Sequence, residues 1–136
     1  MSESIDEDAY ANNYHYFQRS LAILSQDADE QCLAMDNFNV AGEIKDEVIS
    51  NGYAVLNTMS TQLSEQQRIQ IKQLLENASG IPEYVVNVPN TKEDHLKAMT
   101  DPHWAPLRAQ AKQLIAILRA ETDRVRAVLY GEQSGC

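Results

Sequence analysis

The last long segment of the chain, residues 106–130, has the most regular apolar pattern in the sequence. Its apolar side chains recur every three or four residues, which is the repeat of one face of an α-helix. They are Leu107, Ala111, Leu114, Leu118, Val125 and Val128, with Trp104 just upstream. One wider gap, between Leu118 and Val125, contains Glu121 and Thr122. We therefore expect a single helix over 106–130 to form the centre of a helical domain.

Two other segments show the same repeat. Residues 8–25 carry an apolar stripe whose first half is aromatic, which predicts an amphipathic helix. Ser64 and Gln67 have the spacing of a capping box, and this box begins a predicted helix over 65–79. Gly80 follows the last periodic residue and is a common helix-stop signal.

A longer helix is predicted over residues 28–58. Asp27 and Glu30 have capping-box spacing at its start, and the pattern is compatible with a break near Gly42. The dipeptide Asn51-Gly52 is also typical of a tight β-hairpin turn. Apolar residues nevertheless keep a helical spacing across it, at Ile44, Val48, Val55 and Met59. We therefore prefer a helix, with or without a kink at Gly52, to a hairpin.

The remaining segments complete an all-α fold. Residues 83–90 are rich in valine and favour extended backbone, so we expect a short crossing segment without a strand partner. Thr91 begins a short predicted helix over 92–100. At 136 residues the chain fits one domain, a four- to five-helix bundle with frayed tails at 1–6 and 132–136.

The charge of the chain is concentrated in its first part. Residues 1–60 hold eleven acidic and two basic residues and so carry the whole net charge of −9, while residues 61–136 are balanced. Such a charge repels nucleic-acid phosphates and anionic membranes, so neither is an expected partner. No apolar run approaches the length of a membrane span, and the acidic N-terminus is unlike a signal peptide. We expect a cytoplasmic protein.

Catalytic, cofactor and metal motifs are missing from the sequence. It contains no Gly-x-Ser-x-Gly, no phosphate-binding glycine loop and no Cys-x-x-Cys or His-Glu-x-x-His pair. We therefore expect no cofactor, no metal and no enzymatic activity. Its two cysteines, Cys32 and Cys136, are too few for a disulfide framework, and Cys32 is interpreted as a small core residue. His95 is expected at the surface, in the first turn of the helix over 92–100.

Two clusters of charge are candidate interaction sites. Glu43, Asp46 and Glu47 share one helix face, where like charges repel, and acids also cluster at Asp27, Asp29 and Glu30. The basic counterpart lies on the last helix, at Arg108, Lys112, Arg119 and Arg126. This stripe is expected to meet the acidic helix, either within one molecule or between two copies.

One turn combines several special residue types. The residues from Asp101 to Pro106 bring His103 and Trp104 together, as a candidate pocket lip or as a plug at the end of the core. Three functions therefore stay open. The first is a non-enzymatic acidic adaptor, inhibitor or immunity-type protein that binds a basic protein surface. The second is a self-associating subunit or homodimer. The third is a small-molecule-binding or catalytic bundle that uses His103, Trp104, Tyr10 and Tyr14.

Overall fold

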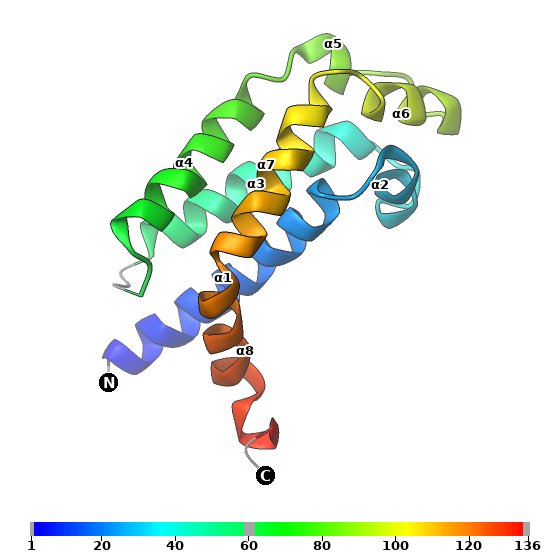
Figure 1. Cartoon of the computed structure of the whole chain (residues 1–136). Coiled ribbons are helices and arrows are strands. Elements are labelled where there is room, and N and C mark those ends of the chain that lie inside the picture. The colour runs from blue at the N-terminus through cyan, green and yellow to red at the C-terminus, as the bar shows by residue number, and fades with distance from the viewer. Residues whose placement is uncertain (1, 59–61, 135–136) are drawn as a thin grey trace.

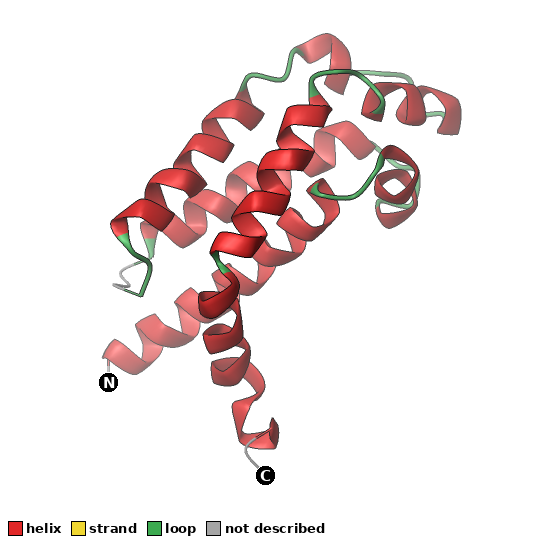
Figure 2. Ribbon diagram, viewed as in Figure 1, coloured by secondary structure: helices red, strands yellow, loops and turns green. Residues whose placement is uncertain are grey.

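The computed structural model describes residues 2–58 and 62–134, and these residues form eight α-helices and no strand (Figures 1 and 2). The helices are α1 Ser2–Leu24, α2 Ala28–Ala34, α3 Val40–Asn57, α4 Glu65–Ser79, α5 Glu83–Val86, α6 Lys92–Met99, α7 Trp104–Ile117 and α8 Arg119–Ser134. The all-α prediction is confirmed. None of these helices is long and apolar enough to cross a lipid bilayer.

Four helices form an antiparallel bundle. α1 packs against α3 and α7, and α4 packs against the same two helices on the other side. This arrangement puts α3 and α7 at opposite corners, with α7 in front and α3 behind it in Figure 1. Apolar side chains from all four helices fill the centre, including Phe17, Val48, Leu74 and Leu114, each at most 2% exposed.

The three short helices α2, α5 and α6 cover the end of the bundle that lies away from the N-terminus (Figure 1). The Asp27 carboxylate accepts a hydrogen bond from the backbone N–H of Glu30, so the predicted capping box of α2 is confirmed. His95 of α6 is only 2% exposed, which corrects the expectation of a surface position. Its Nε2 lies 2.5 Å from the side-chain oxygen of Asn90. The short helices at this end therefore bury His95, although the acidic residues beside it in the sequence suggest an exposed position.

The predicted single helix over 106–130 is wrong at one point, because the helix bends at Leu118. Its backbone there has φ −90° and ψ 6°, and α8 leaves the bundle to pack on α1 (Figure 1). The Tyr14 hydroxyl lies 3.2 Å from the Leu118 carbonyl oxygen and 2.8 Å from the Thr122 hydroxyl. A side chain that inserts its polar group beside the helical hydrogen bonds is a known cause of a kink. We attribute the bend to this insertion.

The predicted helix over 28–58 is also two helices, and the break lies before Gly42. Asp36, Asn37 and Asn39 all have positive φ, between 42° and 58°. Asparagine and aspartate tolerate this left-handed conformation better than other residues with a Cβ atom. Three such residues within four positions therefore turn the chain between α2 and α3.

The Asn51-Gly52 dipeptide lies inside α3, so the preferred helix is confirmed and the hairpin alternative is wrong. Gly52 is buried against α4, where a Cβ atom at this position would lie 2.5 Å from a methyl carbon of Leu75. The glycine thus serves close helix packing instead of a turn. Met59, which was part of the expected spacing, lies outside the described residues.

Residues 83–86 form the short helix α5, which corrects the extended segment expected over 83–90. Val85 is 2% exposed, whereas Tyr84 is 63% exposed. The helical turn, with Pro82 as its N-cap residue, directs Val85 into the core. Burial of this one side chain outweighs a weak local preference of valine for strands. The helices over 65–79 and 92–99 agree with their predictions, and α1 begins at Ser2, earlier than expected.

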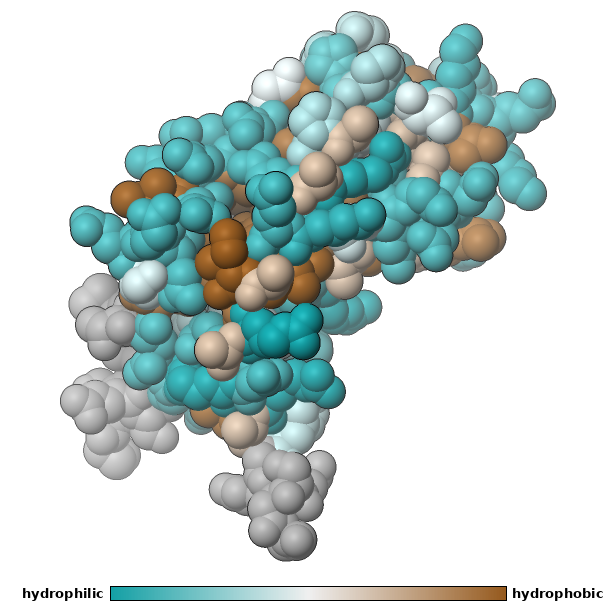
Figure 3. All heavy atoms as spheres, in the orientation of Figure 1, coloured by the Kyte–Doolittle hydropathy of each residue, from teal (hydrophilic) through white to brown (hydrophobic). Residues whose placement is uncertain are grey.

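The surface is largely hydrophilic. On the face fronted by α7, hydrophobic atoms gather mainly near the junction of α7 and α8 (Figure 3). Ile117, the last residue of α7, is 39% exposed there, and Val128 and Tyr130 of α8 are 39% and 51% exposed. Apolar side chains are therefore exposed at the end of α7 and along α8.

Candidate functional site

The acidic residues of α3 lie together, as the sequence predicts. Asp46 is exposed, and Glu43 and Glu47 are partly exposed on the same side of the helix. Partial burial and the neighbouring Glu43 both raise the pKa of Glu47, while the charge of Arg19 acts in the opposite direction. None of the three carboxylates forms a salt bridge with the part of the chain that the structure describes. They form an acidic surface without a salt bridge to the described residues, here called the α3 acidic face.

The acids near α2 have a structural role. Asp27 is the N-cap residue, and Glu30 completes the capping box with its carboxylate 3.4 Å from the Asp27 nitrogen. Asp29 is exposed in the first turn, where the positive end of the helix dipole stabilises it. Two of these three acids, Asp27 and Glu30, therefore serve to cap the helix.

The predicted basic stripe is divided among three environments. Arg108 is half-buried, and its guanidinium donates to the Gln31 side-chain oxygen, at 2.8 Å from Nη2, and to the Met99 carbonyl. Lys112 and Arg119 are exposed on α7 and at the start of α8, and Arg126 lies on α8 beyond the bend. Because α3 and α7 occupy opposite corners of the bundle, the stripe does not lie beside the α3 acidic face in one molecule.

His103 and Trp104 also have separate roles. Trp104 is 1% exposed and belongs to the core, in agreement with the plug interpretation. His103 is exposed; its Nδ1 lies 2.6 Å from Asp101, and its ring contacts the edge of Tyr84. The Tyr10 and Tyr14 rings are each 1% exposed. The residues of the third hypothesis are thus mostly part of the core.

A buried polar network, which sequence reasoning missed, joins α8 to α1. The Tyr10 hydroxyl donates to Glu121 at 2.6 Å, and Arg124 donates to both carboxylate oxygens of Glu121 at 2.9 Å. Arg124 also donates to Glu7 at 2.8 Å and lies over the Tyr10 ring. Hydrogen bonding to Glu121 raises the pKa of Arg124, and burial raises the pKa of Tyr10.

The sequence did contain a signal for this network. Glu121 occupies the seven-residue gap in the apolar stripe, so it stands where the helical repeat requires a core residue. A charged side chain at a core position needs a charged or hydrogen-bonding partner. Glu121 is 6% exposed and has two such partners, Tyr10 and Arg124.

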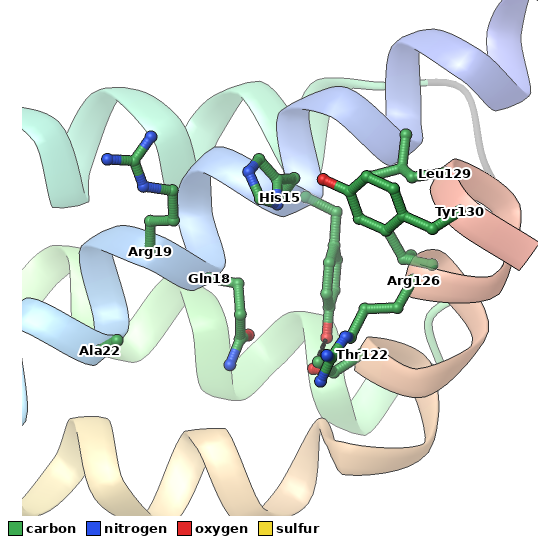
Figure 4. A pocket seen from close by; sticks show the side chains of 10 residues that line it. His15, Gln18, Arg19, Ala22, Thr122, Arg126, Leu129 and Tyr130 are labelled. Atoms are coloured by element: carbon green, nitrogen blue, oxygen red, sulfur yellow. Dashed lines mark hydrogen bonds between the residues drawn. The ribbon is translucent and has the colours of Figure 1, made fainter. Parts of the chain in front are cut away.

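A groove of about 390 Å³ lies between α1 and α8 (Figure 4). Its α1 wall consists of Tyr14, His15, Gln18, Arg19 and Ala22. Its α8 wall consists of Thr122, Val125, Arg126, Leu129 and Tyr130. These ten residues include two arginines and no carboxylate, although the whole chain has a net charge of −9. Of the basic residues predicted to interact, only Arg126 contributes to this groove.

The described residues contain no group of three histidine, cysteine or acidic side chains placed to hold a metal ion. Cys32 is 5% exposed and burial raises the pKa of its thiol, so the prediction of a core cysteine is confirmed. A thiol with a raised pKa forms little of the nucleophilic thiolate. Cys136 lies outside the described residues.

Comparison of the chain with protein-family models, with curated proteins and with solved structures gives no match.

Proposed function

We propose that this chain is a non-enzymatic protein–protein interaction module that binds a basic surface of another protein through the α3 acidic face. The observation that carries the proposal is the Glu43–Glu47 pair. Partial burial and the carboxylate of Glu43, one helical turn away, raise the pKa of Glu47, and neither acid forms a salt bridge with the described residues. A basic partner would remove this repulsion on binding.

The energetics of the pair support a binding role. Like charges four residues apart in a helix cost a few tenths of a kcal/mol, about 0.2–0.5 by comparison with measured pairs. Acidic surfaces also attract basic partners over a distance and increase the rate of association, and salt weakens this attraction. The proposed complex is therefore expected to weaken as the ionic strength rises.

Charge reversal tests the proposal directly. The double variant Glu43→Lys/Glu47→Lys is compared with Glu76→Lys/Glu93→Lys, which changes the net charge equally at exposed sites on α4 and α6. Proteins captured from lysate at low salt are identified by mass spectrometry. We expect a basic partner to bind the wild type and the control variant and to be lost from the Glu43/Glu47 variant. The same partners on all three proteins would contradict the proposal.

A stability measurement shows whether the Glu43–Glu47 pair destabilises the fold or contributes to it. Glu47→Gln removes the repulsion, so we expect it to stabilise the fold at pH 7 by about 0.2–0.5 kcal/mol. The raised pKa of Glu47 means that this gain is largest where the carboxyl is ionised and disappears in acid. Urea unfolding at pH 7 and in acid measures the change in stability. Asp46→Asn on the same helix is the control. A loss of stability in Glu47→Gln would show that the pair is structural.

Self-association is the second candidate, and the corner positions of α3 and α7 favour it. The exposed cations Lys112 and Arg119 cannot reach the α3 acidic face of their own molecule, but they are free to meet that of a second copy. Sedimentation velocity at low and high salt tests this candidate. We expect a dimer that dissociates in high salt, and a monomer under both conditions would exclude it.

A further inference from the structure

We propose that the groove between α1 and α8 binds a small organic anion, a carboxylate on an aromatic body that also carries a hydrogen-bond donor. The proposal does not depend on the proposed function, because none of the α3 acids lines the groove. Its volume of about 390 Å³ falls within the ~300–1,000 Å³ that is usual for small-molecule sites.

The charge of the groove sets the sign of the ligand. Arg126 extends from α8 into the groove, with His15 on the opposite wall (Figure 4). Arg126 makes no hydrogen bond or salt bridge with the described part of the chain, whereas Arg124, two residues earlier, is fully paired with Glu121 and Glu7. An unpaired guanidinium binds carboxylates through two parallel hydrogen bonds. Arg126 is therefore available to an external anion.

The walls of the groove suit a flat apolar body. The buried residues Tyr14 and Val125 line it, and Leu129 adds a partly buried aliphatic surface. The rings of His15 and Tyr130 lie on facing walls near one end (Figure 4). An aromatic ligand can pack against these side chains, since aromatic pairs prefer stacked or edge-to-face contacts.

Gln18 indicates the second polar group of the ligand. Its side-chain oxygen is buried and has no hydrogen-bond partner in the described part of the chain, although the residue lines the groove. Buried acceptors without a partner are uncommon in folded proteins because the hydrogen bond to water that burial removes is not replaced. A hydroxyl or amine donor on the ligand would supply the missing bond.

Three probes separate the contribution of the carboxylate from that of the hydrogen-bond donor. We would use 4-hydroxyphenylacetate, phenylacetate, which lacks the donor, and 4-hydroxyphenylacetamide, which lacks the charge. Isothermal titration gives the affinities, and amide chemical shifts in NMR spectra give the location. We expect 4-hydroxyphenylacetate to bind with the highest affinity, the neutral amide to bind about tenfold more weakly, and the shifts to lie around His15 and Arg126.

Matched variants decide the result. Arg126→Gln should weaken the binding of 4-hydroxyphenylacetate about tenfold and leave the binding of the amide unchanged, because only the carboxylate pairs with Arg126. Arg119→Gln removes the same charge from an exposed site of α8 outside the groove and should change neither. Circular dichroism checks that both variants fold. The absence of binding to the wild type, shifts outside the groove, or equal effects of the two variants would overturn the proposal.

Discussion

The four-helix bundle and the contact between α8 and α1 differ in the share of polar interactions that stabilises them. The bundle centre is apolar, with side chains such as Phe17 and Leu74 that are fully buried. The α1–α8 contact also buries apolar side chains, but it adds hydrogen bonds between the hydroxyl, carboxylate and guanidinium groups of Tyr10, Glu121 and Arg124. Apolar burial does not depend on direction or pH, whereas the polar network requires fixed geometry and one protonation state. The two regions should therefore respond differently to mutation and to pH.

The largest expected effect comes from the bundle centre. Phe17→Ala leaves a cavity where a side chain is 0% exposed, so we expect it to lower the free energy of unfolding by about 3–5 kcal/mol. The only other phenylalanine, Phe38, is 61% exposed and provides the matched control. Phe38→Ala should change stability by less than about 0.5 kcal/mol in urea unfolding. Similar losses in both variants would show that the apolar centre is not packed as described.

A smaller and local effect is expected from the polar network. Glu121→Gln keeps the side-chain shape but weakens its bonds to Arg124 and Tyr10, at a cost of about 1–3 kcal/mol. Because α8 lies outside the bundle, amide hydrogen exchange should accelerate in α8 and the first half of α1 and stay unchanged in α3 and α4. Asp123→Asn, at an exposed position two residues away, is the control. Uniform acceleration across all helices would mean that the two regions unfold together.

The third expected effect is a loss of stability at high pH that comes from the α1–α8 contact. Burial raises the pKa of Tyr10 and Tyr14 above the ordinary value of 10.0, so the folded state keeps these hydroxyls protonated. Their contribution to stability is complete below pH 10 and is lost above it, because the unfolded chain releases these protons first. The loss is at most about 1.4 kcal/mol per pH unit for each tyrosine.

Tyrosinate absorbance and urea unfolding between pH 8 and pH 11 test this expectation. Burial keeps the hydroxyls of Tyr10 and Tyr14 protonated in the folded protein, so we expect them to ionise only on unfolding, and Tyr16, which is 53% exposed, provides the control. Tyr10→Phe should reduce the slope of stability against pH above pH 10, and Tyr16→Phe should leave it unchanged. Equal slopes in the two variants would place Tyr10 in contact with solvent.

The candidate sites show the same division between what was predicted and what was missed. The sequence places Glu43, Asp46 and Glu47 on one helix face because their spacing alone determines this, and the structure agrees. It does not predict the groove, since the groove forms only because the helix bends at Leu118 and α8 then packs on α1. Arg126 was identified by its charge, and His15, Gln18 and Tyr130 were not connected to it.

The sequence by itself determined where most helices form and which faces are apolar, because capping boxes and three- and four-residue spacing act between near neighbours. Only the tertiary structure decided the bend at Leu118, which depends on the hydroxyl of Tyr14, more than one hundred residues earlier. It also decided that α3 and α7 lie at opposite corners, which separates the acidic and basic residues. The segment over 106–130 therefore has two roles: its first half belongs to the bundle, and its second half forms one wall of the groove. The physical reason is that contacts between distant parts of the chain direct the helices, and local patterns do not encode them.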